Sequence, residues 1–248
     1  MTETVTRDAT RLKTARALLF DLDGVLTPTV DVHMRAWSRL FTEFLGERGA
    51  EPYSDDDYYL YIDGKPRVDG VRSLLASRGI TLPEGTQDDV AGDTTVWALG
   101  NCKNDVFEAE LVENGVEAYP GSLLFLAAAL DAGYDVAVVS SSRNAQPVLV
   151  RAGIRDRFEV IVDGVLAAAE GIAGKPSPDT YLRAAELLGL TAEECVVVED
   201  AHSGVQAGHD GGFGLVVGVD RGVGAQGLLD SGADIVVDDL AELVPALR

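Results

Sequence analysis

Short apolar runs separated by segments of helical spacing constrain the fold of this chain more than any other feature. The first run covers residues 15–20 and stops at a pair of aspartates. The later runs cover residues 134–139, 158–162, 195–198 and 214–219, with a shorter one at 234–237. Such runs are typical of strands buried on both faces of a parallel sheet. The segments 121–130, 146–151 and 179–188 lie between them and end near glycines suited to helix C-caps. This alternation predicts an α/β domain with a mainly parallel sheet.

More than a hundred residues separate the first apolar run from the second. A crossover between neighbouring strands needs far fewer, so we expect an inserted domain there. Its apolar residues follow helical spacing at 37–45 and 68–75, and a third helix is expected at 105–112. We therefore predict a helical cap domain at residues 33–115 and an α/β core at residues 1–32 and 116–248. Two links join them, which would permit hinge motion.

The charge and composition exclude several classes of partner. The chain has 20 basic and 41 acidic residues, for a net charge of −21, which repels nucleic acid and anionic membrane surfaces. No stretch approaches the roughly 18–20 apolar residues of a membrane helix, and the N-terminus lacks the apolar centre of a signal peptide. We expect a cytoplasmic protein, either a monomer or a small homo-oligomer. The acidic run Ser54–Asp57 is interpreted as a solvated face rather than a metal site.

Carboxylates follow two of the predicted strands. Asp21 and Asp23 end the first run, and Glu199 and Asp200 end the run at 195–198. An Asp-Leu-Asp-Gly motif alone fits an ordinary turn equally well. However, ligands of open α/β sheets bind beyond the carboxyl ends of the strands, where these acids would converge. Clustered carboxylates repel one another unless a cation is bound, and oxygen ligands suit Mg²⁺.

Two further predicted strand ends supply groups that complement the acids. Ser140 offers a hydroxyl, and Lys175, in a Gly-Lys-Pro-Ser-Pro segment, offers a positive charge. Each has an ordinary structural interpretation when it is taken alone. Together with the carboxylates, they favour a site that binds an anion such as a phosphate ester beside a metal ion.

These four elements, in this order and spacing, resemble the haloacid dehalogenase superfamily, and the resemblance covers essentially the whole chain. Its motifs are residues 20–25, 139–140, 175–178 and 199–200. The resemblance implies a Rossmann-like core with an inserted cap. It implies that Asp21 attacks phosphorus to form an aspartyl phosphate, and that Asp23 acts as the acid and base. Asp21, the backbone carbonyl of Asp23 and Asp200 would hold Mg²⁺ with Glu199 as a direct or indirect partner, while Ser140 and Lys175 would hold the phosphoryl oxygens.

A finer resemblance connects the chain to the β-phosphoglucomutase group, which interconverts β-glucose 1-phosphate and glucose 6-phosphate. Residues 21–29 and 33–37 carry it. It implies that Thr29 lies at a hinge and that His33 helps to position Asp23. Trp37 matches a substrate-side position, although we interpret it as packing within the cap rather than as a sugar platform. The remaining residues that the resemblance assigns to substrate binding are Gly64, Lys65, Arg67 and Lys103 in the cap and Ser142, Arg143 and Asn144 in the core.

The predicted enzyme therefore acts on a sugar phosphate, with a phosphomutase as the first hypothesis. The alternative is a phosphatase that uses the same Asp21 chemistry and passes the phosphoryl group to water. A non-catalytic phospho-acceptor or metal-binding signalling module is a third class. The large inserted domain argues against that class, because such a module needs no lid that excludes water.

Overall fold

The computed structural model describes residues 11–247, which separate into two compact units. The larger unit ends its first segment at Pro28 and resumes at Glu117, and the smaller unit is Thr29–Val116. The predicted boundary at residue 33 lies inside a helix, α2 (Val30–Glu47). The apolar spacing that predicts this helix starts only at Trp37, so the sequence pattern does not indicate its first turn.

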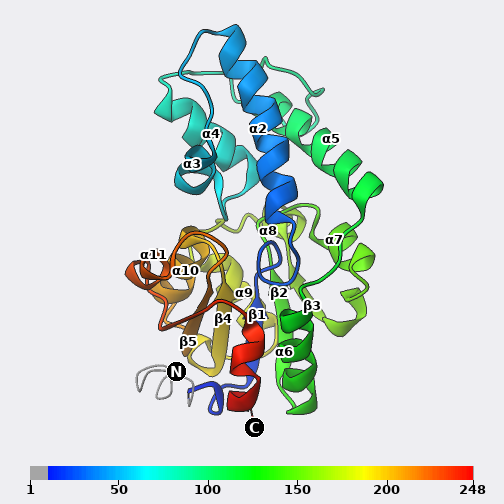
Figure 1. Ribbon diagram of the computed structural model, residues 1–248, viewed down its shortest axis with the longest axis vertical. Helices are drawn as coiled ribbons and strands as arrows, with labels where there is room; N and C mark the ends of the chain where they lie inside the picture. The colour runs from blue at the N-terminus through cyan, green and yellow to red at the C-terminus, as the bar shows by residue number, and fades with distance from the viewer. Residues whose placement is uncertain (1–10, 248) are drawn as a thin grey trace. The chain divides into compact units, whose positions relative to one another are not determined.

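Six strands form one parallel sheet in the larger unit, in the order β3-β2-β1-β4-β5-β6 (Figure 1). The strands are β1 (Ala17–Phe20), β2 (Asp135–Val139), β3 (Val160–Val162), β4 (Cys195–Glu199), β5 (Leu215–Val219) and β6 (Ile235–Val237). The predicted parallel sheet is confirmed. Phe20 at the end of β1 pairs with Val138 of β2 and Val198 of β4. The carboxyl ends of these three strands therefore lie side by side, where open α/β sheets bind ligands.

Helices cover both faces of the sheet. They are α6 (Pro120–Asp131), α7 (Ala145–Arg151), α8 (Gly164–Glu170), α9 (Asp179–Leu187), α10 (His202–Asp210) and α11 (Ala225–Asp230), with 3₁₀ turns η2 (Arg155–Arg157), η3 (Ala192–Glu194) and η4 (Leu240–Leu247). Leu19 belongs to a buried cluster with Tyr181 of α9 and Val205 of α10. Phe20 points to the other face, where its ring meets Phe125 of α6 edge-on with centroids 6.1 Å apart. Successive strand residues thus serve opposite faces, as the pleat requires.

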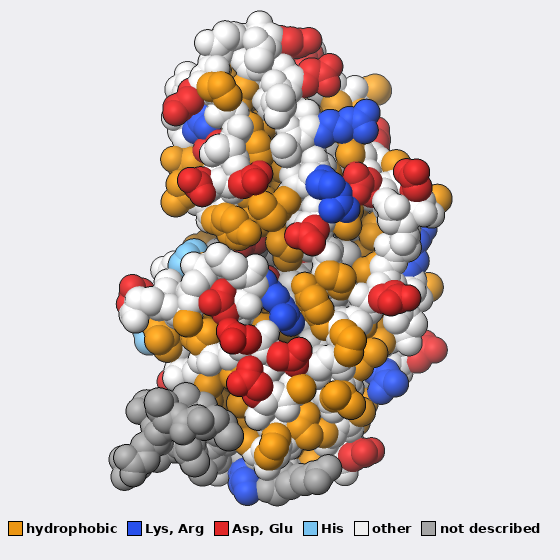
Figure 2. Space-filling view, in the orientation of Figure 1, with side chains coloured by type: hydrophobic (Ala, Val, Ile, Leu, Met, Phe, Trp, Pro, Cys, Tyr) orange, Lys and Arg blue, Asp and Glu red, His pale blue; other side chains and the backbone are white. Residues whose placement is uncertain are grey.

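An apolar hollow lies where α6 packs against η4. Figure 2 shows hydrophobic side chains exposed on the larger unit. Its walls include Leu124 and Ala128 of α6 and Val244 of η4. Among the residues that the structure describes, no helix has both the length and the hydropathy needed to cross a bilayer.

The smaller unit consists of helices. After α2 come a short helix α3 (Asp55–Asp57), a π-helical turn η1 (Tyr58–Ile62), α4 (Arg67–Ser77) and α5 (Val96–Asn114). Their core contains Trp37, Phe41, Ile62, Leu74 and Leu99. Helix α5 begins well before the predicted residue 105, because Thr95 caps it by accepting a hydrogen bond from the Ala98 N–H at 3.0 Å.

The interpretation of the run Ser54–Asp57 as a solvated face is wrong for Asp57, which is 5% exposed. Its Oδ2 accepts hydrogen bonds from Arg78 Nη2 at 2.6 Å and from the Ser54 N–H at 2.8 Å. Burial opposes ionisation of Asp57, but these hydrogen bonds outweigh it and hold its pKa below the usual 3.8. The aspartate therefore anchors the start of α3 to the end of α4.

Replacing Asp57 with Asn is expected to lower the free energy of unfolding by about 3 kcal/mol at neutral pH, since it removes the buried carboxylate that pairs with Arg78. Because the pKa of Asp57 is lowered by folding, its contribution is present above about pH 3.9 and is lost as the pH falls through the folded-state value. Urea unfolding near pH 7 and near pH 3 measures both effects. Glu84→Gln, which breaks the exposed pair with Arg72, is the control and is expected to cost under about 1 kcal/mol. Equal losses in the two variants would contradict this role of Asp57.

Candidate active site

A buried lysine connects two carboxylates at the carboxyl edge of the sheet. Asp21 follows β1, and its N–H donates to the Val198 carbonyl of β4 at 2.9 Å. Lys175 Nζ donates to Asp21 Oδ1 at 2.5 Å, to Glu199 Oε1 at 2.6 Å and to the Val139 carbonyl at 3.0 Å. Each acceptor lies at the carboxyl end of a different central strand. The lysine therefore links the ends of β1, β2 and β4 through one nitrogen atom.

Glu199 is fully buried, and four donors surround its carboxylate. Oε1 accepts from Lys175 Nζ and from the Tyr181 hydroxyl at 3.0 Å, while Oε2 accepts from the N–H groups of Asp200 and Ala201 at 2.9 and 3.0 Å. A Cβ atom at Gly204 of α10 would lie 1.7 Å from Glu199 Oε1. The first turn of this helix therefore needs a glycine to make room for the carboxylate, although glycine disfavours helices.

The burial of these groups sets their protonation. Burial raises the pKa of Asp21 well above its usual 3.8; Lys175 opposes this effect, whereas Glu199 and Asp23 add to it. Burial alone would lower the pKa of Lys175, but the charges of Asp21 and Glu199 outweigh it and raise that pKa above the usual 10.5. The positive charge of Lys175 is thus shared between two carboxylates, so it offsets the negative charge of Asp21 only in part.

Three carboxylates are close enough to bind one cation. Asp21, Glu199 and Asp200 are buried, and one oxygen from each lies within 4.8 Å of the others. Three buried acids beside one lysine leave an excess of negative charge, which fits a divalent metal ion held by oxygen ligands. The acidic cluster expected from the sequence is therefore present.

Asp23 lies on a tight loop that immediately follows Asp21. The N–H groups of Leu26 and Thr27 donate to the Leu22 carbonyl at 2.9 and 3.0 Å, and the Gly24 N–H donates to the Thr27 carbonyl at 2.7 Å. Gly24 has a φ of +87°, which favours glycine. Asp23 is partly exposed, unlike Asp21. The two acids therefore differ in environment even though they are two residues apart.

The loop after β2 contains the remaining predicted residues of the core. Ser140 is buried, and its Oγ accepts from the Ser142 N–H at 3.1 Å. Ser142 Oγ in turn accepts from the N–H of Asn144, the residue just before α7, at 3.1 Å. The stem of Arg143 packs against Gly164, and a side chain at position 164 would clash with it. Residues 140–144 therefore form one ordered turn beside the end of β1.

In the smaller unit, the structure brings His33 of α2 and Lys103 of α5 together. Lys103 Nζ lies 2.5 Å from His33 Nδ1. The ammonium also lies 4.4 Å from the ring centroid of Phe107 and 5.3 Å from that of Trp37. Trp37 is 2% exposed and stacks on Phe41, so it forms part of the helical core here.

The other two cations predicted in this unit, Lys65 and Arg67, lie at or just before the start of α4 and contact different partners. Arg67 begins the helix, and its Nη2 donates to Asn101 Oδ1 at 3.1 Å. Lys65 instead bonds to the Tyr61 carbonyl and Ser73 Oγ at 3.0 and 3.2 Å, and burial lowers its pKa. Gly64 has a φ of +69° at the turn between them and η1. Thr29 is buried, and its carbonyl accepts from the His33 N–H at 2.9 Å.

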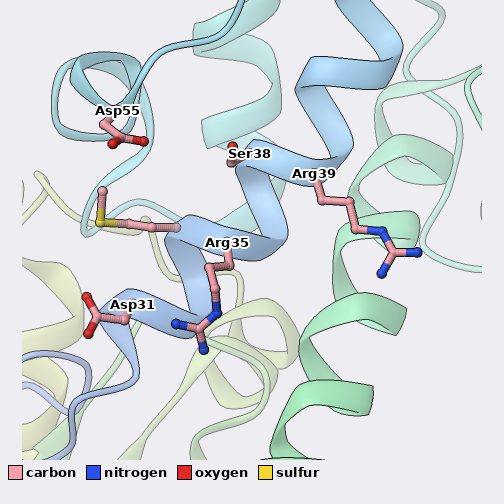
Figure 3. Close-up of a pocket in the computed structure, with 6 residues that line it drawn as sticks. Asp31, Arg35, Ser38, Arg39 and Asp55 are labelled. Carbon is pink, nitrogen blue, oxygen red and sulfur yellow. The ribbon is translucent and has the colours of Figure 1, made fainter.

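A hollow on the helical unit combines acidic and basic side chains (Figure 3). The residues described along its wall are Asp31, Met34, Arg35, Ser38, Arg39 and Asp55. Arg35 donates through Nε and Nη2 to Glu110 Oε2 at 3.0 and 2.8 Å. These lining residues include none of the predicted site residues, so the hollow is a surface feature of mixed charge.

Sequence reasoning missed two residues that contact the site. Tyr181 lies on the first turns of α9 and holds Glu199 through its hydroxyl. No pattern distinguishes it from an ordinary core residue of a helix. Arg221 follows β5 and donates from Nε to the Gly24 carbonyl at 2.8 Å. Its position beyond a strand's carboxyl end is a signal that could have identified it.

Comparisons with known proteins agree with this architecture. The family model of haloacid dehalogenase-like hydrolases matches residues 15–212. The chain is 50% identical to a β-phosphoglucomutase of Mycobacterium bovis over 92% of this chain and 91% of that one. It is 33% identical to hexitol phosphatase A of Escherichia coli over 78% of each chain. The crystal structure of a β-phosphoglucomutase from Clostridium difficile superposes with a TM-score of 0.73 at 25% identity, covering 92% of this chain and 93% of that one.

The family match spans most of the chain and includes every strand of the sheet except β5 and β6. The acid cluster, Lys175 and the ordered turn after β2 all lie within it. With its parallel sheet and its inserted helical unit, the chain belongs to the haloacid dehalogenase-like hydrolase family.

Proposed function

We propose that this protein is a Mg²⁺-dependent β-phosphoglucomutase that converts β-glucose 1-phosphate into glucose 6-phosphate through an aspartyl phosphate. The observation that carries the proposal is the buried group in which Lys175 bridges Asp21 and Glu199 beside Asp200. It combines a carboxylate nucleophile, a fixed positive charge and oxygen ligands for a metal ion. The 50% identity to a β-phosphoglucomutase over 92% of the chain supports the choice of substrate.

The residues act in the following way. Asp21 attacks phosphorus, and the bond from phosphorus to the sugar oxygen breaks as Asp23 protonates that oxygen. The phosphoryl group then passes from Asp21 to the free hydroxyl of a sugar monophosphate, whose proton returns to Asp23. The sugar bisphosphate that results gives its other phosphoryl group back to Asp21. Lys175 and Ser140 hold the phosphoryl oxygens. Asp21, Asp200 and the Asp23 carbonyl would hold Mg²⁺, with Glu199 beside them, and the bound ion would supply charge neutralisation at the phosphoryl group.

A mutase substrate with two phosphate positions needs a second anion site. In the core, the side chains of Ser142, Arg143 and Asn144 offer a hydroxyl, a cation and an amide on a turn whose own hydrogen bonds hold it in place. In the helical unit, we assign the distal phosphate to Arg67 at the start of α4, where the helix dipole also favours an anion. Lys103, Lys65 and Gly64 support this contact, and His33 positions Asp23 about the hinge at Thr29.

The direct test is to incubate the purified protein with β-glucose 1-phosphate, Mg²⁺ and a trace of glucose 1,6-bisphosphate. We expect glucose 6-phosphate to accumulate without an equivalent release of inorganic phosphate. Release of phosphate alone would instead support a sugar or hexitol phosphatase. The 33% identity to hexitol phosphatase A favours that enzyme as the second candidate, so a panel of hexitol phosphates belongs in the same assay.

Replacing Arg67 with Ala is expected to lower kcat/KM for β-glucose 1-phosphate roughly 30- to 100-fold, because a charged contact to a phosphate is lost. Formation of the aspartyl phosphate from acetyl phosphate, which has no distal phosphate, should change less than about threefold. Arg72→Ala on the same helix is the matched control, since Arg72 is exposed and pairs with Glu84. Similar losses for the two variants would place the distal phosphate elsewhere.

A further inference from the structure

We propose that Arg221 is a positioning residue that orients Asp23 through the backbone of Gly24. This inference rests on the proposed function, because it concerns the proton that Asp23 supplies. Arg221 lies beyond β5, two strands away from β1 in the sheet. It nevertheless reaches the loop that carries Asp23, and that contact is the starting point of the proposal.

The guanidinium of Arg221 is held by three separate segments of the core. Nε donates to the Gly24 carbonyl at 2.8 Å, and Nη1 donates to the Asp238 carbonyl at 3.0 Å. Its central carbon lies 4.0 Å from the ring centroid of Tyr119, a cation–π contact. Its position is therefore determined by groups on each side rather than by one flexible contact.

Stability alone does not explain the arrangement of the Arg221 guanidinium. Nη2 is buried and has no hydrogen-bond partner among the described residues. A buried donor without a partner opposes folding. The contact with Gly24 is therefore better explained by what it orients than by its contribution to stability.

Arg221 is one of three outside donors that hold the Asp23 loop. The carbonyls of Gly24, Val25 and Leu26 accept, in that order, from Arg221 Nε, from Ser122 Oγ at 2.6 Å and from the Tyr119 N–H at 2.9 Å. Arg221 holds the carbonyl nearest to Asp23. Gly24, at φ +87°, is also the residue about which the loop rotates most easily. Fixing its carbonyl therefore restricts the direction in which Asp23 projects.

A misdirected Asp23 would impair only the steps that need its proton. When a sugar phosphate reacts, Asp21 forms a bond to phosphorus, the bond to the sugar oxygen breaks, and that oxygen takes the proton of Asp23. When acetyl phosphate reacts, the departing acetate is stable as an anion and needs no proton. Comparing the two phosphoryl donors therefore distinguishes an effect on proton transfer from an effect on nucleophilic attack by Asp21.

The experiment compares Arg221→Met, which keeps a long unbranched side chain but has no guanidinium, with Arg221→Lys and wild type. With Mg²⁺ saturating, the rate of a single phosphorylation is followed by acid quench and intact mass, using glucose 1,6-bisphosphate or acetyl phosphate as donor. For Arg221→Met we expect a loss of roughly 10- to 100-fold with the sugar bisphosphate and less than about threefold with acetyl phosphate. Arg221→Lys should recover part of the loss.

Arg155→Met is the matched control, because Arg155 also donates from Nη1 to a carbonyl, that of Phe158 at 2.8 Å, within the same unit. We expect both of its rates to match wild type. Equal losses with the two donors in Arg221→Met would indicate a general structural role and overturn the proposal, as would no loss with either donor.

Failure of the proposed function gives a different result. If acetyl phosphate but not the sugar bisphosphate phosphorylates wild type, the mutase proposal is wrong. The Arg221→Met experiment is then repeated with a hexitol phosphate in place of the sugar bisphosphate. The proposal again requires a larger loss of rate with the hexitol phosphate than with acetyl phosphate. If no donor phosphorylates wild type, the aspartyl phosphate chemistry is wrong and the role of Arg221 is rejected with it.

Discussion

Asp21→Asn is expected to abolish phosphoryl transfer, lowering kcat by at least about 10⁴-fold. The amide has nearly the shape of the carboxylate but is a poor nucleophile, so no acyl phosphate should form. Asp21 is also the carboxylate that Lys175 contacts at 2.5 Å, at the end of the central strand of the sheet. We therefore expect the loss to appear with every phosphoryl donor, unlike the selective effect at Arg221.

The measurement is the gain of one phosphoryl group by the intact protein after an acid quench. Wild type incubated with acetyl phosphate and Mg²⁺ should show it, and Asp21→Asn should not. Asp135→Asn, which alters an exposed aspartate at the start of β2, serves as the control and should behave as wild type. A phosphorylated Asp21→Asn protein would mean that another residue is the nucleophile.

Asp21→Asn should also keep the fold, with an unfolding free energy within about 1 kcal/mol of wild type. Lys175 retains Glu199 as a partner in that variant. Burial of the Asp21 charge is only partly compensated in the metal-free protein, as the raised pKa shows. Loss of activity with an intact unfolding transition separates chemistry from stability.

Lys175→Met is the change with the second largest expected effect, because it damages both catalysis and folding. Removing the cation should lower kcat by at least about 10³-fold, since the phosphoryl oxygens lose a fixed positive charge. It also leaves Asp21 and Glu199 buried without their shared partner. In the absence of metal, we expect a loss of about 3–5 kcal/mol in unfolding free energy at neutral pH.

The loss in Lys175→Met should depend on pH in a defined direction. Without Lys175, the pKa of Asp21 rises further, so the folded state binds more protons than the unfolded state. Stability then falls as the pH rises above the unfolded-state value of about 3.9. Urea unfolding in EDTA should therefore show a larger loss near pH 8 than near pH 5.

Two further variants test this explanation. In Lys175→Met/Glu199→Gln, one of the two buried charges is removed, so stability should partly recover while activity stays absent. Lys13→Met, which changes an exposed lysine of the same unit, should alter neither property. A Lys175→Met protein as stable as wild type at every pH would show that the two carboxylates do not depend on Lys175.

The sheet could be predicted from the sequence because each strand is a compact apolar run. Each predicted run matches one strand, although β4 extends one residue past its run, to Glu199. The glycines after α6, α7 and α9 have the positive φ expected of C-caps. Helix α10 was not predicted, because its glycines weaken the helical pattern. Gly204 is there to admit the Glu199 carboxylate, a tertiary reason that no local pattern reveals.

The candidate site was predictable to a similar extent. Asp21 follows β1, and Glu199 and Asp200 lie at the end of β4, so the rule that strand ends meet brings these acids together. The predicted strand end before Lys175 is wrong, because Lys175 lies in the loop between α8 and α9. Tyr181 and Arg221 depend instead on which strand lies beside which and on where long side chains reach. Asp57 was misinterpreted for the same reason, since its partner Arg78 lies at the far end of α4. Pairing of this kind appears only once the helices are packed.

The hydrogen bond from the Tyr119 N–H to the Leu26 carbonyl has a consequence for how such proteins diversify. It shows that the chain leaves the larger unit and returns to it at neighbouring points. The two ends of the insertion are therefore joined by a hydrogen bond within the larger unit itself. A segment attached in this way can be exchanged as a cassette, lengthened or redesigned while the strands and their acids stay in register. Grafting the helical unit of a relative between Pro28 and Glu117 is expected to change substrate preference while the strands of the larger unit keep their acids in place.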